Sequence, residues 1–282
     1  MSKDSKYLVF NRTVLQVAAL VTMLIDHIGV MFVADPGLYE VFRIIGRIAF
    51  VIFAFIICEG VFYTKRPLKY ALRLFILYFV TQIVIVINFY IDGGPFFYSN
   101  IFLTLLSSAA LLIYFHHKLY KHVYLLIPFL AHATLTTLAL IYPNNNNILM
   151  FTGDYMIYGT LLIVGFYLSS LVAKQMTIYQ ARKYQIPEDM YLDSIVLQFN
   201  KNIAWCIFLL LLSVIWYVLG RWTAYTGVDP ITQTYALLAL PFLFLYNGKK
   251  GYDAKWWRIT YYLFYPVHLI VLAVIYILIY LI

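Results

Sequence analysis

The stretch Val14-Leu-Gln-Val-Ala-Ala-Leu-Val-Thr-Met-Leu-Ile-Asp-His-Ile-Gly-Val-Met-Phe-Val33 decides the class of this chain. It has the apolar character and the length, about 20 residues, of one membrane-spanning helix. Similar runs recur throughout the 282 residues, of which 64% are hydrophobic and only 11% charged. This composition excludes an ordinary soluble domain. It predicts an all-α fold, a polytopic bundle of transmembrane helices whose constant partner is the lipid bilayer.

Pro, Gly, Asn and charged residues separate the apolar runs and mark the loops between spans. No internal repeat is evident, and no polar stretch is long enough for a second domain, so residues 1–282 are predicted to form a single integral membrane domain. The longest polar loop covers residues 174–201 and is a candidate to carry an amphipathic helix on the membrane surface. The nine predicted spans are residues 13–33, 41–63, 70–91, 100–116, 122–142, 155–173, 202–220, 232–247 and 259–281.

The distribution of basic residues predicts the orientation of the spans. The net charge is +8, and all but three of the 20 Lys and Arg residues lie at the N-terminus or in alternate loops. Because cytoplasmic loops carry the excess of Lys and Arg, we expect a cytoplasmic N-terminus, a cytoplasmic loop at 174–201 and a multi-pass protein of the plasma membrane. The same pattern gives no reason to expect a nucleic-acid partner. The two cysteines, and histidines that no carboxylate accompanies, give no reason to expect a metal site.

Ionisable residues inside the first two spans are the strongest functional signal. Asp26 and His27 lie within the first span, and Arg43 and Arg47 lie one helical turn apart at the start of the second. Each such charge costs roughly 2.5–3.5 kcal/mol on membrane insertion, so a chain that retains them uses them. The two spans run in opposite directions, which brings these groups to similar depth in the outer half of the bilayer. We expect Asp26 to pair with Arg43 or Arg47, either as a simple link between helices or as part of an active site.

Further polar residues fall near the same depth in other spans. His268 follows Pro266, a residue that usually kinks a helix, and it either reaches a central cavity or is simply packed. Asn100 and Thr104 form a polar stripe that joins helices or, with Asp154, contacts a substrate. Glu59 and Arg73 lie nearer the cytoplasm and are expected to form an ion pair, with contact to a ligand as the alternative.

Several of these residues occur in motifs that resemble the TraX family when taken together. The motifs keep their order over most of the chain, and Val51 replaces the proline that usually follows the second of them. They are Met23-Leu-Ile-Asp-His-Ile-Gly29, Arg43-Ile-Ile-Gly-Arg-Ile-Ala-Phe50, Phe53-Ala-Phe-Ile-Ile-Cys-Glu-Gly60, Tyr70-Ala-Leu-Arg-Leu74, Asn100-Ile-Phe-Leu-Thr-Leu105, Gly153-Asp-Tyr155 and Tyr265-Pro-Val-His-Leu269.

The resemblance implies an integral membrane acetyltransferase, similar to the wider transmembrane acyltransferases. Such enzymes take acetyl-CoA or another acyl-CoA from the cytoplasm and modify an extracytoplasmic peptide or glycan; pilin N-acetylation is the founding activity. Acyl transfer needs a general base and a group that stabilises the oxyanion. We therefore expect His27 to act as general base or transient acyl carrier, Arg47 to contact the oxyanion or acceptor, Asp26 to orient Arg43 or Arg47, and His268 to be a second candidate base.

The phosphates of the donor need cations at the cytoplasmic ends of the spans. Four such residues follow the second span, and Lys249 and Lys250 are the alternative. The four expected donor-binding residues are Lys65, Arg66, Lys69 and Arg73.

Two other classes of protein would use the buried residues of the first two spans differently. A transporter would use the Asp, Arg and His residues as a substrate or proton site, and a scaffold would tolerate their replacement.

Overall fold

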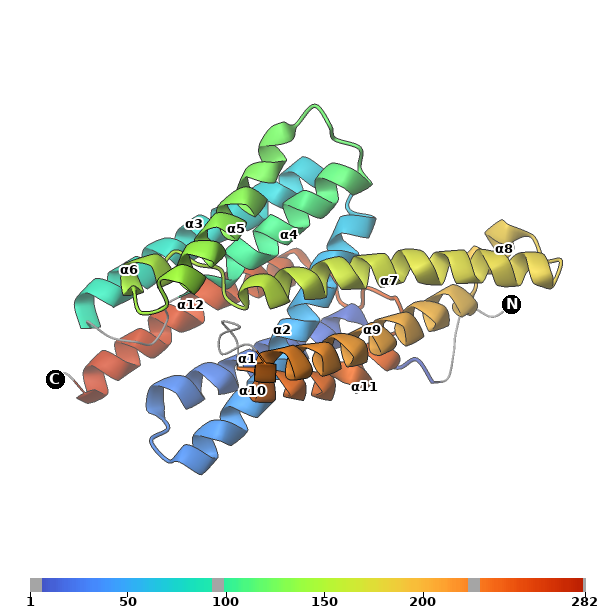
Figure 1. Ribbon diagram of the computed structural model, residues 1–282. Coiled ribbons are helices and arrows are strands. Elements are labelled where there is room, and N and C mark those ends of the chain that lie inside the picture. Colours follow the sequence, from blue (N-terminus) through green and yellow to red (C-terminus); the bar gives the residue numbers. More distant parts are fainter. Residues whose placement is uncertain (1–6, 93–98, 223–228, 281–282) are drawn as a thin grey trace.

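The computed structural model describes residues 7–92, 99–222 and 229–280, and these fold into helices joined by short connections (Figure 1). The prediction of an all-α fold is confirmed, because the described residues contain only an isolated β-bridge, between Phe10 and Tyr246. The elements are α1 (Arg12–Phe32), α2 (Pro36–Tyr63), α3 (Pro67–Asp92), α4 (Ile101–His116), η1 (Val123–Leu126), α5 (Ile127–Ile141), α6 (Asn146–Leu149), α7 (Met156–Lys183), α8 (Glu188–Leu192), α9 (Ile195–Trp222), α10 (Pro230–Thr234), η2 (Tyr235–Ala239), α11 (Leu240–Phe244) and α12 (Lys255–Tyr280).

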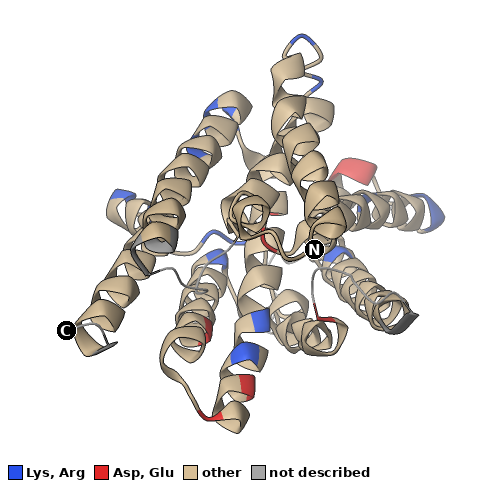
Figure 2. Cartoon of the chain, turned by 60° about the vertical axis from the view of Figure 1, so that its left-hand side comes forward, with Lys and Arg blue, Asp and Glu red and all other residues tan. Residues whose placement is uncertain are grey.

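Seven helices in the described ranges are long and apolar enough to cross a membrane. Two shorter apolar helical segments, Ile101–His116 and Pro230–Phe244, occupy the positions of the fourth and eighth predicted spans. The second of these is broken into α10, η2 and α11. The chain is therefore a multi-pass membrane protein, and the exact number of crossings and the side of the N-terminus stay predictions. Figure 2 shows long stretches of helix without charged residues, as a hydrocarbon environment requires.

Helix α2 forms the centre of the bundle and passes between the other helices (Figure 1). It begins at Pro36, directly after Asp35, whose side chain accepts a hydrogen bond from the Leu38 amide at 2.8 Å. This arrangement is a favourable start for a helix, because the cap satisfies a free N–H and proline lacks one. From Ala49 to Val61 its side chains are almost all buried. The central position of α2 places its two arginines against neighbouring helices.

The polar segment 174–201 is largely helical. Helix α7 continues to Lys183, and α9 begins at Ile195, so the connection between the two long helices is short and contains α8. The polar residues extend both helices because they bond to one another: the Asn200 amide on α9 donates to Thr177 Oγ1 at 2.9 Å and to Gln180 Oε1 at 2.8 Å on α7. The predicted loop is thus replaced by two paired helix ends.

Five basic side chains, from α1, α3, α12 and the segment just before α12, lie together at one end of this bundle, which we call the basic end: Arg12, Arg73, Lys250, Lys255 and Arg258. Residues 10–12, before and at the start of α1, lie there against the segment 245–249 that precedes α12. The Phe10 amide donates to the Leu245 carbonyl at 3.0 Å, and the Arg12 amide donates to the Lys249 carbonyl at 2.9 Å. Helices α1 and α12 therefore start side by side and run in the same direction.

Candidate active site

Asp26 is the centre of a buried ion cluster between α1 and α2. Its Oδ2 accepts from Arg43 Nη1 at 2.8 Å, and its Oδ1 lies 3.5 Å from Arg47 Nη2. Arg47 also donates from Nε to the Arg43 carbonyl at 3.1 Å. Only 7% of Asp26 and 5% of Arg47 are exposed, so each charge depends on the other for compensation. The structure therefore joins Asp26 to both arginines that the sequence offered as partners.

Two glycines allow α1 and α2 to approach closely enough for these contacts. A Cβ atom at Gly46 would collide with the Asp26 carboxyl group, and a Cβ at Gly29 would collide with the side chain of Phe42. Small residues at such crossings let helix backbones pack tightly. The ion cluster thus depends on the absence of a side chain at Gly46.

His27 and His268 form a direct side-chain contact between α1 and α12. His27 Nδ1 lies 2.6 Å from His268 Nε2, and the two ring planes differ by only 2°. His268 is buried, and Tyr265 packs edge-on against both rings, with centroid distances of 5.9 Å to His27 and 5.3 Å to His268. The two histidines of the predicted site are therefore a single unit.

The tautomers of this pair follow from the partner of His268. Its Nδ1 lies 2.8 Å from the Phe264 carbonyl, and a carbonyl oxygen only accepts, so Nδ1 carries the proton. In the neutral ring, Nε2 then accepts and His27 Nδ1 donates, which leaves the lone pair of His27 on Nε2. This arrangement gives His27 the form of an oriented base, and His268 is the residue that orients it.

A cavity of about 540 Å³ opens beside the ion cluster, at the end of the bundle opposite the basic end. Arg43 and Arg47 line it, together with Asp154 and Tyr155 from the connection between α6 and α7. Of the described residues, neither His27 nor His268 lines it. The prediction of one pocket shared by His27 and Arg47 therefore does not describe this cavity, which Arg47 lines and His27 does not. We call this space the outer cavity.

Asn100 and Thr104 support the wall of the outer cavity instead of lining it. Both are fully buried. The Asn100 amide N–H donates to the Thr152 carbonyl at 2.9 Å, and Thr104 Oγ1 donates to the Asp154 carbonyl at 2.5 Å. They fix the loop that presents Tyr155, whose φ is +60° and whose ring lies 5.4 Å from the Arg47 guanidinium carbon. We therefore assign them a positioning role.

Asp154 faces the outer cavity from this loop. Burial raises the pKa of its carboxyl group, and the positive charges of Arg47 and Arg43 oppose that rise. Its Oδ1 accepts from the Tyr155 amide at 2.9 Å. Of the three residues predicted to bind substrate, Asp154 is therefore the one in a position to contact a ligand.

The four predicted donor-binding residues lie in the connection after α2 and in the first two turns of α3. Lys65, Arg66 and Lys69 are exposed, and Arg73 lines a cavity at the basic end. Lys250, the alternative from the sequence, lines the same cavity. The expected ion pair between Glu59 and Arg73 is wrong: Glu59 Oε2 accepts from the Tyr246 hydroxyl at 3.2 Å. The long α3 turns Arg73 away from α2 and towards α12.

The sequence reasoning missed Tyr155 and Tyr265. Tyr155 stacks on Phe50 with a centroid distance of 3.7 Å as well as lying against Arg47. Both tyrosines belong to motifs of the family resemblance, beside Asp154 and Pro266, but in a chain with 27 tyrosines neither was predicted to be a site residue. Among the described residues, no group of three His, Cys, Asp or Glu side chains is placed to hold a metal ion.

Comparison with known proteins adds one finding to this geometry. The family model described as TraX protein matches residues 11–276, which is nearly the whole chain. The chain belongs to the TraX family. A search of curated proteins and a search of solved structures each give no match.

The TraX match covers every residue of the ion cluster and of the histidine pair. The resemblance inferred from the sequence motifs is therefore confirmed as family membership. The TraX region also includes α1 from its first residue and most of α12, the two helices that carry His27 and His268. Both residues of the pair, and most of the two helices that bring them together, therefore lie within the matched part of the chain.

Proposed function

We propose that this protein is a membrane-embedded acyltransferase that moves an acetyl or other acyl group from acyl-CoA to an extracytoplasmic amine or hydroxyl. The observation that carries the proposal is the 2.6 Å contact between His27 Nδ1 and His268 Nε2, next to the cluster of Asp26 and its two arginines. An oriented imidazole beside a guanidinium is the combination that acyl transfer requires. Membership of the TraX family supports the same reading.

In the proposed reaction, His27 Nε2 removes a proton from the acceptor. The acceptor nitrogen or oxygen forms a bond to the thioester carbonyl carbon, and the negative charge passes to the carbonyl oxygen. The C–S bond then breaks, and the thiolate of coenzyme A takes the proton from the His27 imidazolium. His268 stabilises that imidazolium by accepting from Nδ1. The products are the acylated acceptor and free coenzyme A, so His27 ends the cycle neutral.

The outer cavity is the proposed site of the acceptor. Its walls combine the cations Arg43 and Arg47 with the carboxylates Glu40, Asp154 and Asp229, so it suits a polar acceptor such as a peptide N-terminus, including that of a pilin, or a surface glycan. An acceptor that enters here meets Arg47 before it reaches the level of His27. We assign Arg47 the contact to the acceptor or to the oxyanion, and Asp26 the orientation of both arginines.

The test compares cells that produce the wild-type protein with cells that produce His27→Ala at the same membrane level. Mass spectrometry of extracytoplasmic peptides and glycans should find acyl groups that depend on the wild-type protein and disappear in the variant. Purified protein with labelled acetyl-CoA should release coenzyme A only when His27 is present. Identical acyl patterns in both strains would contradict the proposal. Uptake of a solute into proteoliposomes without release of coenzyme A would indicate a transporter instead.

A further inference from the structure

A second cavity, of about 590 Å³, opens at the basic end of the bundle between the starts of α1 and α12 and the first turns of α3. We call it the inner cavity. Five cationic side chains line it against a single carboxylate, that of Asp253. Asp253 offsets only part of this charge, since its Oδ1 lies 3.4 Å from Arg258 Nε. The space therefore suits a ligand with several negative charges. The five cations are Arg12, Arg73, Lys250, Lys255 and Arg258.

Backbone contacts hold two of these cations together. Thr13 Oγ1 lies 3.1 Å from the carbonyls of both Lys250 and Tyr252, one residue after Arg12. Gly251, between them, has φ +73°, and a Cβ at this position would lie 2.5 Å from Asn11 Oδ1. The turn that presents Lys250 is thus fixed against the start of α1. A positively charged loop that serves only to orient spans in the membrane requires no such fixed turn.

Arg12 is the member of the set that most clearly lacks its ligand. Its Nε is buried and has no hydrogen-bond partner among the described residues. Buried donors of this kind are rare, because leaving one unsatisfied costs roughly 1–3 kcal/mol. Because Arg12 also lines the inner cavity, an anion bound there can become the partner of this guanidinium once the side chain turns towards it.

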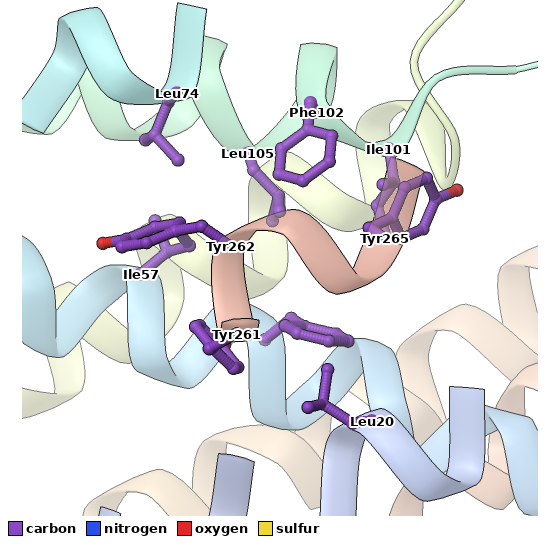
Figure 3. A pocket seen from close by; sticks show the side chains of 10 residues that line it. Leu20, Ile57, Leu74, Ile101, Phe102, Leu105, Tyr261, Tyr262 and Tyr265 are labelled. Carbon is purple, nitrogen blue, oxygen red and sulfur yellow. The ribbon is translucent and has the colours of Figure 1, made fainter. Parts of the chain in front are cut away.

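A small apolar pocket lies next to the inner cavity, on the side of the histidine pair. Tyr261 and Tyr262 line both the inner cavity and a narrow apolar pocket of about 40 Å³. In Figure 3 this part of α12 lies between Leu74, Phe102 and Leu105 on one side and Leu20 on the other. Tyr265 closes the far end of the pocket, and it is the residue that packs against both His27 and His268. Aromatic and aliphatic side chains make up the whole lining, so the route suits a thin chain and excludes phosphates.

We propose that the inner cavity binds the phosphates of coenzyme A, with its thioester arm lying along the pocket from Tyr262 to Tyr265. This inference rests on the proposed acyltransferase function. A lipid with a phosphorylated head group is also negatively charged, as the phosphates of coenzyme A are. Binding of its head group would not, however, require a single thin chain to lie between α12 and the core of the bundle. From Arg258 to His268 the helix rises about 15 Å, which only a long linker between phosphate and reacting carbon would cover.

Binding of desulfo-CoA, which cannot transfer an acyl group, tests the site apart from the reaction. Calorimetry with the purified full-length protein should show that Lys250→Glu combined with Arg258→Glu weakens binding at least tenfold. Lys121→Glu combined with Lys174→Glu, at exposed positions of a loop and of α7 that do not line the cavity, should change it less than twofold. Failure of the wild-type protein to bind desulfo-CoA would overturn the inference. So would a loss of binding in Lys65→Glu with Arg66→Glu that matches the loss in the cavity variant.

The pocket is tested with a ligand that lacks the arm. Leu105→Trp should fill the pocket and weaken desulfo-CoA binding while adenosine 3′,5′-bisphosphate binds as it does to the wild-type protein. Retained bisphosphate binding also shows that the variant is folded, and Leu105→Met is the conservative control. Equal effects on both ligands, in either direction, would overturn the proposed path of the arm.

Two further results separate the possible outcomes. In nanodiscs of phosphatidylcholine with and without cardiolipin, Lys250→Glu with Arg258→Glu should leave cardiolipin binding unchanged. An effect on cardiolipin alone would assign the cavity to lipid and overturn the inference. Normal acyl transfer in this variant, with an unchanged KM for acetyl-CoA, would overturn the donor site and leave the proposed function standing. If desulfo-CoA binding depends on the cavity but the protein transfers no acyl group, the donor site would stand and the proposed function would be overturned.

Discussion

His27 Nδ1 and His268 Nε2 lie 2.6 Å apart, although 241 residues separate them in the chain. The contact exists because α1 and α12 start together at the basic end and run in parallel, so that both histidines reach the same depth. His268 is fixed on its other side by the Phe264 carbonyl at 2.8 Å. A ring held in this way orients its partner, and this gives the two histidines different roles.

Substitutions at the two histidines should therefore differ in their effects. His27→Ala should reduce acyl transfer by about 10²- to 10⁴-fold, the usual contribution of a general base. His268→Gln retains an oxygen that accepts from His27 Nδ1 and should keep part of the activity, whereas His268→Leu should lose most of it. The rate of coenzyme A release from acetyl-CoA measures all three. Equal activity of the Gln and Leu variants would show that His268 only fills space.

Asp26 should be far more important to stability than an exposed carboxylate. Asp26→Ala leaves Arg47 buried without its partner, which costs about 3–5 kcal/mol for a buried pair. Glu188→Ala is the matched control, because it breaks the exposed ion pair with Arg182 and should cost about 0–1 kcal/mol. Thermal unfolding in detergent should show a large fall in Tm for the first variant alone. Similar values of Tm would mean that the Asp26 cluster is hydrated in the membrane.

Gly46 should not tolerate even one added methyl group. In Gly46→Ala the new Cβ collides with the Asp26 carboxyl group, and overpacking of this kind costs about 1–3 kcal/mol. Gly37→Ala, in the first turn of the same helix, places a Cβ 3.4 Å from the nearest atom, Asp35 Oδ1, and should leave the Tm nearly unchanged. A normal Tm for Gly46→Ala would show that α1 and α2 separate at little cost.

The ion cluster could be predicted from the sequence, whereas its surroundings could not. Asp26, Arg43 and Arg47 lie in consecutive spans joined by a short connection, so helix geometry and depth suffice to bring them together. The pairing of His27 with His268 depends on which distant helix packs against α1. That arrangement is set by tertiary contacts such as the Phe10 amide with the Leu245 carbonyl, which no periodicity in the sequence reveals.

The donor-binding residues show the same difference. The sequence predicts Lys65, Arg66 and Lys69 to bind the donor because they follow the second span directly in the chain. In the structure, the cations that share a cavity come from α1, from α3, and from α12 with the turn before it, segments that are remote in sequence. Basic residues near span ends look alike from the sequence, because all of them also satisfy the topology rule.

The orientation of the spans is tested by cysteine labelling in intact cells. With Cys58 and Cys206 replaced by Ala, Gly37→Cys should react with a membrane-impermeant maleimide, because the connection before α2 is predicted to be outside. Lys69→Cys should react only after the membrane is permeabilised. Both positions are exposed in the structure, so a failure to react would not come from burial. The opposite labelling pattern would reverse the predicted topology and place the inner cavity on the wrong side for acyl-CoA.

The hydroxyl of Thr104 should be needed for the shape of the outer cavity. It donates to the Asp154 carbonyl at 2.5 Å and so fixes the loop in which Tyr155 adopts a φ of +60°. That φ is unfavourable for a residue with a side chain, so the loop needs such contacts to persist. Thr104→Val preserves the volume but leaves a buried carbonyl unsatisfied, at a cost of about 1–3 kcal/mol. Thr104→Ser keeps the hydrogen bond.

We therefore expect Thr104→Val to lower the Tm and raise the KM for the acceptor, and Thr104→Ser to behave almost as the wild type. The KM for acetyl-CoA should stay unchanged in both variants, because the inner cavity lies at the other end of the bundle. Kinetics with each substrate varied in turn measure the three quantities. A rise in the KM for acetyl-CoA alone would place the loop of Asp154 and Tyr155 on the donor side, and the assignment of the outer cavity to the acceptor would then be wrong.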